Sequence, residues 1–181
     1  RNFPIPGHNA PGIVQAMDFL KNQNEIVDGL KKVIPELDAR GKNVIVIGGG
    51  DTGSDCIGTS NRQGAKSVVN FEILPKPPKD RSNENPWPYW PFTLKSTSSH
   101  EEGIKREWSI LTKEFIANDK GQLTGLKTVE VKWPDMSKTV HYSGDFLYKN
   151  SLVNTSLVSD KILWDKNCLL YTSDAADEIT G

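Results

Sequence analysis

The chain has 181 residues, of which 36% are hydrophobic and 25% charged, and this composition is typical of one ordinary soluble domain. Twenty-two basic residues against 23 acidic ones give a net charge of −1, which gives no reason to expect a nucleic-acid or membrane partner. Two cysteines, Cys56 and Cys168, are too few and too far apart for a disulfide framework or a Cys-x-x-Cys metal site, so we expect a reduced, cytoplasmic setting. No apolar run approaches the roughly 18 residues of a membrane span. Because the first residue is Arg1 and not methionine, we expect a fragment of a longer protein.

The first 37 residues are predicted to form a linker and two helices. Residues 1–12 hold several prolines and glycines, which predicts a stiff, extended linker. Apolar residues then recur at helical spacing in two runs, which predicts two helices with core-facing sides, and Pro35 is expected to end or kink the second. The two runs are Ile13, Val14, Met17 and Leu20, and then Ile26, Val27, Leu30, Val33, Ile34 and Leu37.

A glycine-rich turn organises the rest of the chain. Residues 44–47 are a continuous apolar run, typical of a parallel strand buried on both faces. Gly48, Gly50 and Gly53 then take the fixed places of the pattern G-x-G-x-x-G. In such a turn the first glycine permits the tight bend, the second lets the backbone approach a pyrophosphate, and the third lets helix pack on strand. We therefore expect Gly50→Val to abolish cofactor binding with little loss of folding.

The residues after this turn complete a βαβ unit. A helix is predicted over residues 54–63, ended by Gly64, and an apolar run over residues 67–74 predicts the next parallel strand. Glu72 lies 19 positions after Gly53, close to the spacing of about 20 at which an acidic residue meets the ribose 2′-OH of a dinucleotide. The glycine pattern alone is weak, because ordinary turns also contain glycine clusters, but the surrounding elements support it.

Glu72 also bears on which nicotinamide cofactor is used. A carboxylate at this position favours NAD(H) over NADP(H), because a 2′-phosphate would bring negative charge against it. Two alternatives remain open. In the first, Lys76 and Lys79 of the following loop swing toward the 2′-phosphate of NADP(H). In the second, Glu72 faces the other side of the sheet, where its role is structural.

A proline-dense loop follows at residues 75–91 and carries Trp87, Tyr89 and Trp90. We expect the loop to be fixed by its own rings near the nucleotide edge of the sheet, the alternative being a proline-rich ligand for a partner protein.

The next region is predicted to be surface and then a β-hairpin. His100 and the charged residues 101–107 are expected to be solvent-exposed. Strands are predicted over residues 108–116 and 126–133, joined by a turn at residues 118–121. The expected fold class is therefore α/β, with a parallel sheet and an inserted antiparallel β-hairpin.

Five stretches together resemble the small (β) subunit, or the β-like C-terminal region, of NADH-type glutamate synthase. The resemblance covers residues 1–133, and it implies a Rossmann-like nicotinamide-nucleotide domain of the FAD/NAD(P)-binding type, with residues 1–12 as its linker. The stretches are RNFPIPG at 1–7, AMDFL at 16–20, VIVIGGGDTGSDC at 44–56, NFEILPKPP at 70–78 and NPWP at 85–88.

The resemblance also implies an activity. In the whole enzyme, hydride passes from NADH to FAD, and electrons continue through iron–sulfur clusters to FMN, where glutamine and 2-oxoglutarate yield L-glutamate. The implied partners are the FAD domain of the same chain and the large (α) subunit or a linked α-like region. No catalytic side chain and no metal ligand is expected in this chain. The expected cofactor-binding residues are Gly48, Gly49, Gly50, Asp51, Thr52, Gly53 and Glu72.

Residues 134–181 depart from the family pattern and are expected to be a divergent or artefactual tail. Residues 168–178 resemble a translated sequencing adapter, and residues after about Lys166 are expected to be disordered, because the end of the chain has almost no apolar surface. Two other functions remain open for the chain. One is the NAD(P) domain of another FAD-dependent reductase, of the dihydropyrimidine dehydrogenase type, and the other is a non-catalytic nucleotide-sensing Rossmann module.

Overall fold

The computed structural model describes residues 5–83, 86–88, 93–132, 157–163 and 168–172. Its elements alternate between strands and helices in the first half, and strands follow one another in the second. In chain order they are β1 (Ile13–Gln15), α1 (Ala16–Val27), the 3-10 helix η1 (Pro35–Leu37), β2 (Asn43–Ile47), α2 (Gly50–Gln63), β3 (Ser67–Phe71), α3 (Ser98–Glu101), β4 (Lys105–Glu107), β5 (Ile110–Ala117), β6 (Leu123–Val131), β7 (Leu157–Leu163) and β8 (Cys168–Thr172).

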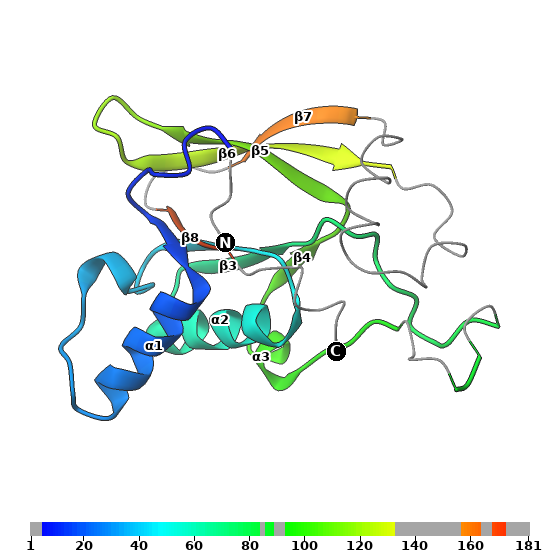
Figure 1. Ribbon diagram of the computed structural model, residues 1–181, viewed down its shortest axis with the longest axis horizontal. Coiled ribbons are helices and arrows are strands. Elements are labelled where there is room, and N and C mark those ends of the chain that lie inside the picture. Colours follow the sequence, from blue (N-terminus) through cyan, green and yellow to red (C-terminus); the bar gives the residue numbers. More distant parts are fainter. Residues whose placement is uncertain (1–4, 84–85, 89–92, 133–156, 164–167, 173–181) are drawn as a thin grey trace.

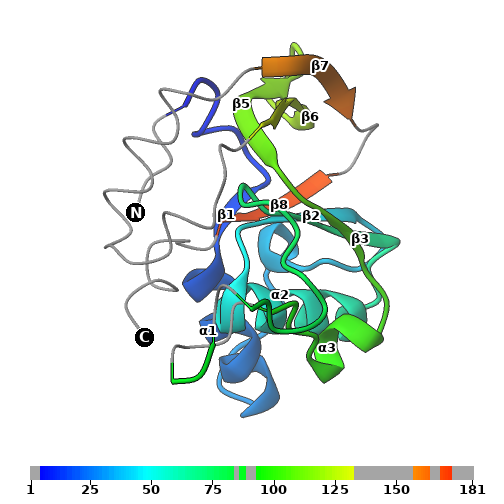
Figure 2. The same ribbon diagram turned by 90° about the vertical axis from the view of Figure 1, so that its right-hand side faces the viewer.

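The described elements form three layers. A five-stranded parallel sheet in the order β1-β8-β2-β3-β4 lies in the middle. Helices α1, α2 and α3 cover one face, and an antiparallel sheet in the order β5-β6-β7 covers the other (Figures 1 and 2). The predicted α/β class, with a parallel sheet and an antiparallel hairpin, is confirmed.

Strand β2 shows why its sequence is a continuous apolar run. Val44 and Val46 belong to the core cluster on the helix side, whereas Ile45 and Ile47 belong to the cluster against the antiparallel sheet. Alternate side chains of a strand point to opposite faces, so both faces of β2 need apolar residues. Full burial of each such side chain contributes about 1.5 to 3 kcal/mol before the entropy of ordering is subtracted.

The glycine-motif region follows the predicted order of strand, helix and strand. Helix α2 ends at Gln63, and Gly64 adopts the left-handed conformation with a φ of 86°. Its N–H donates to the carbonyl of Asn61 at 2.9 Å. This is the helix termination that glycine at this position predicts.

Two parts of the first 37 residues differ from the prediction, whereas the first predicted helix is present as α1. Ile13–Gln15 form strand β1 rather than a helix start, because β-branched residues directly after Pro11 and Gly12 favour an extended backbone. The predicted second helix is wrong: α1 continues to Val27, Gly29 then takes a φ of 72°, and only the short η1 follows. The apolar residues of that region are largely outside the core. Val27 is 74% exposed, Leu30 73% and Val33 50%.

The N-terminal segment of residues 5–12 packs on the hairpin. The Pro6 carbonyl accepts a hydrogen bond from the N–H of Phe115 at 2.9 Å, and the Pro11 carbonyl accepts one from Leu123 at 3.3 Å. Gly7 has a φ of 80°, and a Cβ at that position would lie 2.3 Å from the Phe115 carbonyl oxygen. The close approach of the two backbones therefore requires glycine there.

Two stretches of the tail form strands. Leu157–Leu163 pair with β6 as strand β7, and Cys168–Thr172 lie between β1 and β2 as strand β8. The sequence Cys-Leu-Leu-Tyr-Thr is short, uncharged and rich in strand-forming residues, so it suits a strand in the parallel sheet. The prediction of disorder is wrong for these five residues, and for residues 173–181 it lies outside the described residues.

Candidate functional site

The site is built around the turn between β2 and α2. Strand β2 ends at Ile47, Gly48 has a φ of 95°, and Gly50, the first residue of α2, has a φ of 68°. Residues with a Cβ rarely adopt these angles, so the bend needs glycine at both positions. Gly53 is buried one turn further along α2. The structure thus brings the predicted turn residues together at the carboxyl edge of β2.

The start of α2 has donors available for an anion. No side chain within the described part of the chain caps this helix, whose N-cap residue is Gly49. The first helical hydrogen bond runs from Gly53 N–H to the Gly49 carbonyl at 3.3 Å, so the N–H groups of Asp51 and Thr52 precede it. With 14 residues, α2 is long enough to present a full N-terminal partial positive charge. These features fit a pyrophosphate.

Asn70 fixes the turn to the neighbouring strand. Its side chain is buried within β3, and its Nδ2 donates to the carbonyl oxygens of Gly48 at 2.6 Å and of Val46 at 3.2 Å. The N–H of Gly48 in turn donates to the Phe71 carbonyl at 2.9 Å. Asn70 was not among the residues predicted to form the turn. The signal was a lone amide inside an apolar strand, because a buried amide requires hydrogen-bond partners.

Glu72 lies beside the turn. The alternation along β3 places Val68, Asn70 and Glu72 on the helix side of the sheet. A Cβ built on Gly49 would lie 3.0 Å from Glu72 Oε2, so the carboxylate is close to the glycine backbone. Burial raises the pKa of Glu72, and the neighbouring Arg106 opposes that shift. The Glu72 carboxylate therefore lies on the side of the sheet that carries the glycine turn.

Arg106 is the residue that the sequence analysis missed. It was assigned to a solvated charged run, but it lies in β4, paired with β3, and its Nη2 donates to Glu72 Oε1 at 2.8 Å. Its side chain is 19% exposed and that of Glu72 is 17% exposed. Lys76 and Lys79, the first basic residues after Glu72 in the chain, were the cations that the prediction considered for a phosphate. A pairing across parallel strands far apart in sequence has no local signal, so only the fold reveals it.

Helix α3 packs beside α2 through polar contacts. Ser54 Oγ and Thr97 Oγ1 are 2.5 Å apart, and the N–H of Thr97 donates to His100 Nδ1 at 3.0 Å. Burial, followed by the charge of Arg106, lowers the pKa of His100. The prediction that His100 is exposed surface is wrong, since it is half-buried and caps the helix.

In the proline-dense loop, the prediction that the aromatic rings fix the loop is wrong for Trp87. This ring is 83% exposed, so it does not fix the loop against the domain. Tyr89 and Trp90, the other two aromatic residues of that prediction, lie outside the described residues.

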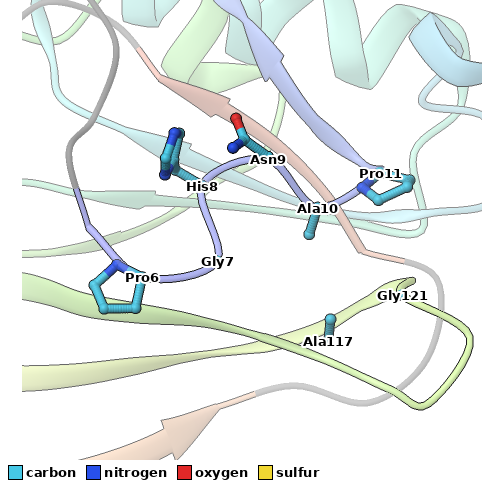
Figure 3. Close-up of a pocket in the computed structure, with 8 residues that line it drawn as sticks. All are labelled: Pro6, Gly7, His8, Asn9, Ala10, Pro11, Ala117 and Gly121. Atoms are coloured by element: carbon cyan, nitrogen blue, oxygen red, sulfur yellow. The ribbon is translucent and has the colours of Figure 1, made fainter.

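A separate hollow of about 560 Å³ lies between the N-terminal segment and the tip of the hairpin (Figure 3). Pro6, His8 and Asn9 line it from one side, and Ala117 and Gly121 from the other. None of the described residues around it belongs to the glycine turn. Within the same described ranges, no three His, Cys, Asp or Glu side chains gather as a metal site, and no helix is long and apolar enough to cross a membrane.

The chain is similar to glutamate synthases. It is 46% identical over 145 residues to the NADH glutamate synthase of Schizosaccharomyces pombe, covering 76% of this chain and 7% of that protein. It is 42% identical over 158 residues to the NADPH glutamate synthase small chain of Mycobacterium tuberculosis, covering 84% of this chain and 32% of that one. No family model matches the chain.

The fold is that of FAD/NAD(P)-binding oxidoreductases. The structure of M. tuberculosis FprA in complex with NADPH matches 96% of this chain and 47% of FprA, with a TM-score of 0.57 at 13% identity, and this likeness concerns the fold alone. The chain spans 32% or less of the two sequence relatives above. With 42 to 46% identity to them over 76 to 84% of its own length, the chain belongs to the glutamate synthase family.

Proposed function

We propose that this chain supplies the nicotinamide-nucleotide-binding part of a glutamate synthase, which passes hydride from NADH to FAD for the synthesis of L-glutamate from glutamine and 2-oxoglutarate. The observation that carries the proposal is the position of Glu72. Its carboxylate lies against Gly49, directly beside an uncapped helix start, which is the arrangement of acidic residue and glycine turn that a dinucleotide requires.

Each predicted site residue has a role in this proposal. The turn and the first turn of α2 hold the pyrophosphate through backbone N–H groups, and Glu72 accepts hydrogen bonds from the adenosine ribose hydroxyls. When bound, the nicotinamide supplies the hydride, and the chain supplies binding and orientation. The residues of the turn are Gly48, Gly49, Gly50, Asp51, Thr52 and Gly53.

NADH is proposed over NADPH. The Glu72 carboxylate supports this choice because it would repel a 2′-phosphate. The relatives include enzymes named for NADH in yeasts and for NADPH in bacteria, so membership of the family leaves the choice to the residues of the site.

The rest of the assembly follows from the same proposal. Residues 1–133 form the nucleotide-binding unit, with residues 1–12 as the linker from an FAD domain and residues 134–181 as a divergent tail. The partner is the large (α) chain or a linked α-like region, which carries FMN and iron–sulfur chemistry. The bacterial relatives named as small chains support such a partner. A cytoplasmic location is proposed because Cys56 is a buried free thiol in a chain with few cysteines.

The test is a titration of the complete enzyme, meaning the polypeptide that contains these residues together with its FAD domain. Glu72→Ala should weaken NADH binding about tenfold, the scale of one lost hydrogen bond to a charged group, and weaken NADPH binding less. Calorimetric dissociation constants for both nucleotides measure the change. Glu107→Ala is the matched control, because Glu107 lies next to Arg106 and points to the opposite face of β4. An unchanged ratio of the two affinities in Glu72→Ala would remove Glu72 from the site.

The same experiment separates the proposal from the two other functions. NADH binding without flavin reduction would indicate a nucleotide-sensing module. Flavin reduction that never supports glutamate formation with the large chain would indicate another reductase.

A further inference from the structure

We propose that Arg106 is a positioning residue that holds the Glu72 carboxylate against the glycine turn and so sets the preference for NADH over NADPH. This inference rests on the proposed function, because Arg106 acts through Glu72 on the ribose site.

The first argument is the way in which the two side chains meet. Arg106 donates to one carboxylate oxygen of Glu72, Oε1, at 2.8 Å. The other oxygen, Oε2, is the atom nearest to the Cβ position of Gly49, at 3.0 Å. The ion pair therefore fixes the carboxylate while leaving the oxygen beside the turn able to accept a ribose hydroxyl.

The second argument is that Arg106 is held in place by groups other than Glu72. Its Nη1 donates to the Lys95 carbonyl at 2.9 Å, and its guanidinium carbon lies 4.4 Å from the centroid of the Trp108 ring. With Glu72 as the third contact, the guanidinium of Arg106 is oriented before any nucleotide binds. Preorganisation of this kind lowers the entropy lost on binding.

The third argument is charge. Burial favours the protonated form of Glu72, and Arg106 is the charged group that opposes this effect. His100 of α3 lies near enough to Arg106 for its own pKa to be lowered, by burial first and by the charge of Arg106 second. A protonated Glu72 would no longer repel a phosphate. Arg106 therefore keeps Glu72 both in position and ionised.

The test compares Arg106→Gln and Arg106→Lys in the complete enzyme. Arg106→Gln should weaken NADH binding about tenfold and NADPH binding less, so that the preference narrows. Arg106→Lys keeps a cation and should recover most of the lost NADH affinity. Lys105→Gln is the matched control, because Lys105 is the adjacent residue of β4, its side chain is 71% exposed, and it pairs with Glu107.

Two further measurements distinguish positioning from a general structural role. In the Glu72→Gln background, Arg106→Gln should change the NADH dissociation constant by less than about twofold, because an effect that passes through Glu72 has already been removed. In the wild type, NADH affinity should fall as the pH decreases through the raised pKa of Glu72, above its ordinary value of 4.5. Arg106→Gln should move this loss to higher pH.

The outcomes separate the two proposals. If the wild-type enzyme binds neither nucleotide, the proposed function fails. If it binds NADH and Arg106→Gln binds both nucleotides unchanged, only the role of Arg106 fails. Equal weakening of both nucleotides together with a lower melting temperature would make Arg106 merely structural, and weakening of NADPH alone would make it a phosphate ligand. Either result overturns the inference.

Discussion

Gly49 and Gly50 are neighbours in one turn, yet the backbone makes different demands on them. Gly50 has a φ of 68°, which costs a residue with a Cβ about 1 to 2 kcal/mol. Gly49 has a φ of −119° and a ψ of −144°, so it lacks the positive φ of Gly50. The expectation that Gly50→Val spares folding is therefore wrong, because valine would strain the turn as well as fill the space of the pyrophosphate.

Gly49→Ala separates binding from folding at this turn. Its Cβ would lie 3.0 Å from Glu72 Oε2 and 3.1 Å from Glu72 Cδ, so the carboxylate must move away. We expect NADH affinity in the complete enzyme to fall severalfold, with a smaller loss of melting temperature than Gly50→Ala shows, because the Glu72 carboxylate must move but the backbone keeps its φ. Gly50→Ala is the comparison and should lower both. Unchanged NADH affinity in Gly49→Ala would show that the position of Glu72 does not matter for binding.

At the scale of elements, α3 carries a pH-sensitive cap. Thr97 N–H donates to His100 Nδ1, which accepts only when that nitrogen carries no proton. The pKa of His100 is lowered from its ordinary value of 6.5, so the unfolded chain binds the proton more readily than the folded one. The stabilisation is therefore fully present above 6.5 and is lost as the pH falls through the lowered pKa.

The corresponding prediction compares urea unfolding of the wild-type chain with His100→Gln at about pH 7.5 and about pH 5.5, on either side of the ordinary histidine pKa. The wild type should lose more stability between the two conditions than His100→Gln, because glutamine accepts the same hydrogen bond without titrating. His8→Gln serves as the control, since His8 is remote from α3 in the chain and bonds to Ile5. Equal losses in the wild type and His100→Gln would refute the cap.

At the scale of the whole molecule, the sequence predicted those elements whose formation depends on residues close to one another in the chain. The βαβ unit and the hairpin were found because their apolar periods and glycine positions are local. The second predicted helix, after Val27, was wrong because apolar residues at helical spacing do not have to face a core, and Gly29 with its positive φ ends the helical conformation there.

The part of the site that escaped prediction depends on long-range pairing. Glu72 was located by its spacing from the glycines, but its partner Arg106 is brought beside it by the parallel pairing of β3 and β4. The same pairing partly buries residues such as Arg106, which belong to a charged run that looks solvent-exposed in the sequence. The proposed nucleotide specificity therefore depends on the pairing of β3 with β4, whereas the glycine motif by itself predicts only the proposed pyrophosphate site.

The last prediction concerns the 181-residue chain by itself. Its sequence contains one G-x-G-x-x-G pattern, at Gly48, Gly50 and Gly53, and hydride transfer requires a flavin held against the nicotinamide. We expect the purified chain to bind NADH weakly or not at all and to reduce no acceptor such as ferricyanide. Joining it to its FAD domain should restore both NADH binding and acceptor reduction. Calorimetry with NADH, the visible absorbance of bound flavin and acceptor reduction measure the difference. Bound FAD in the purified chain, or turnover without an added FAD domain, would show that the flavin site is encoded in these residues.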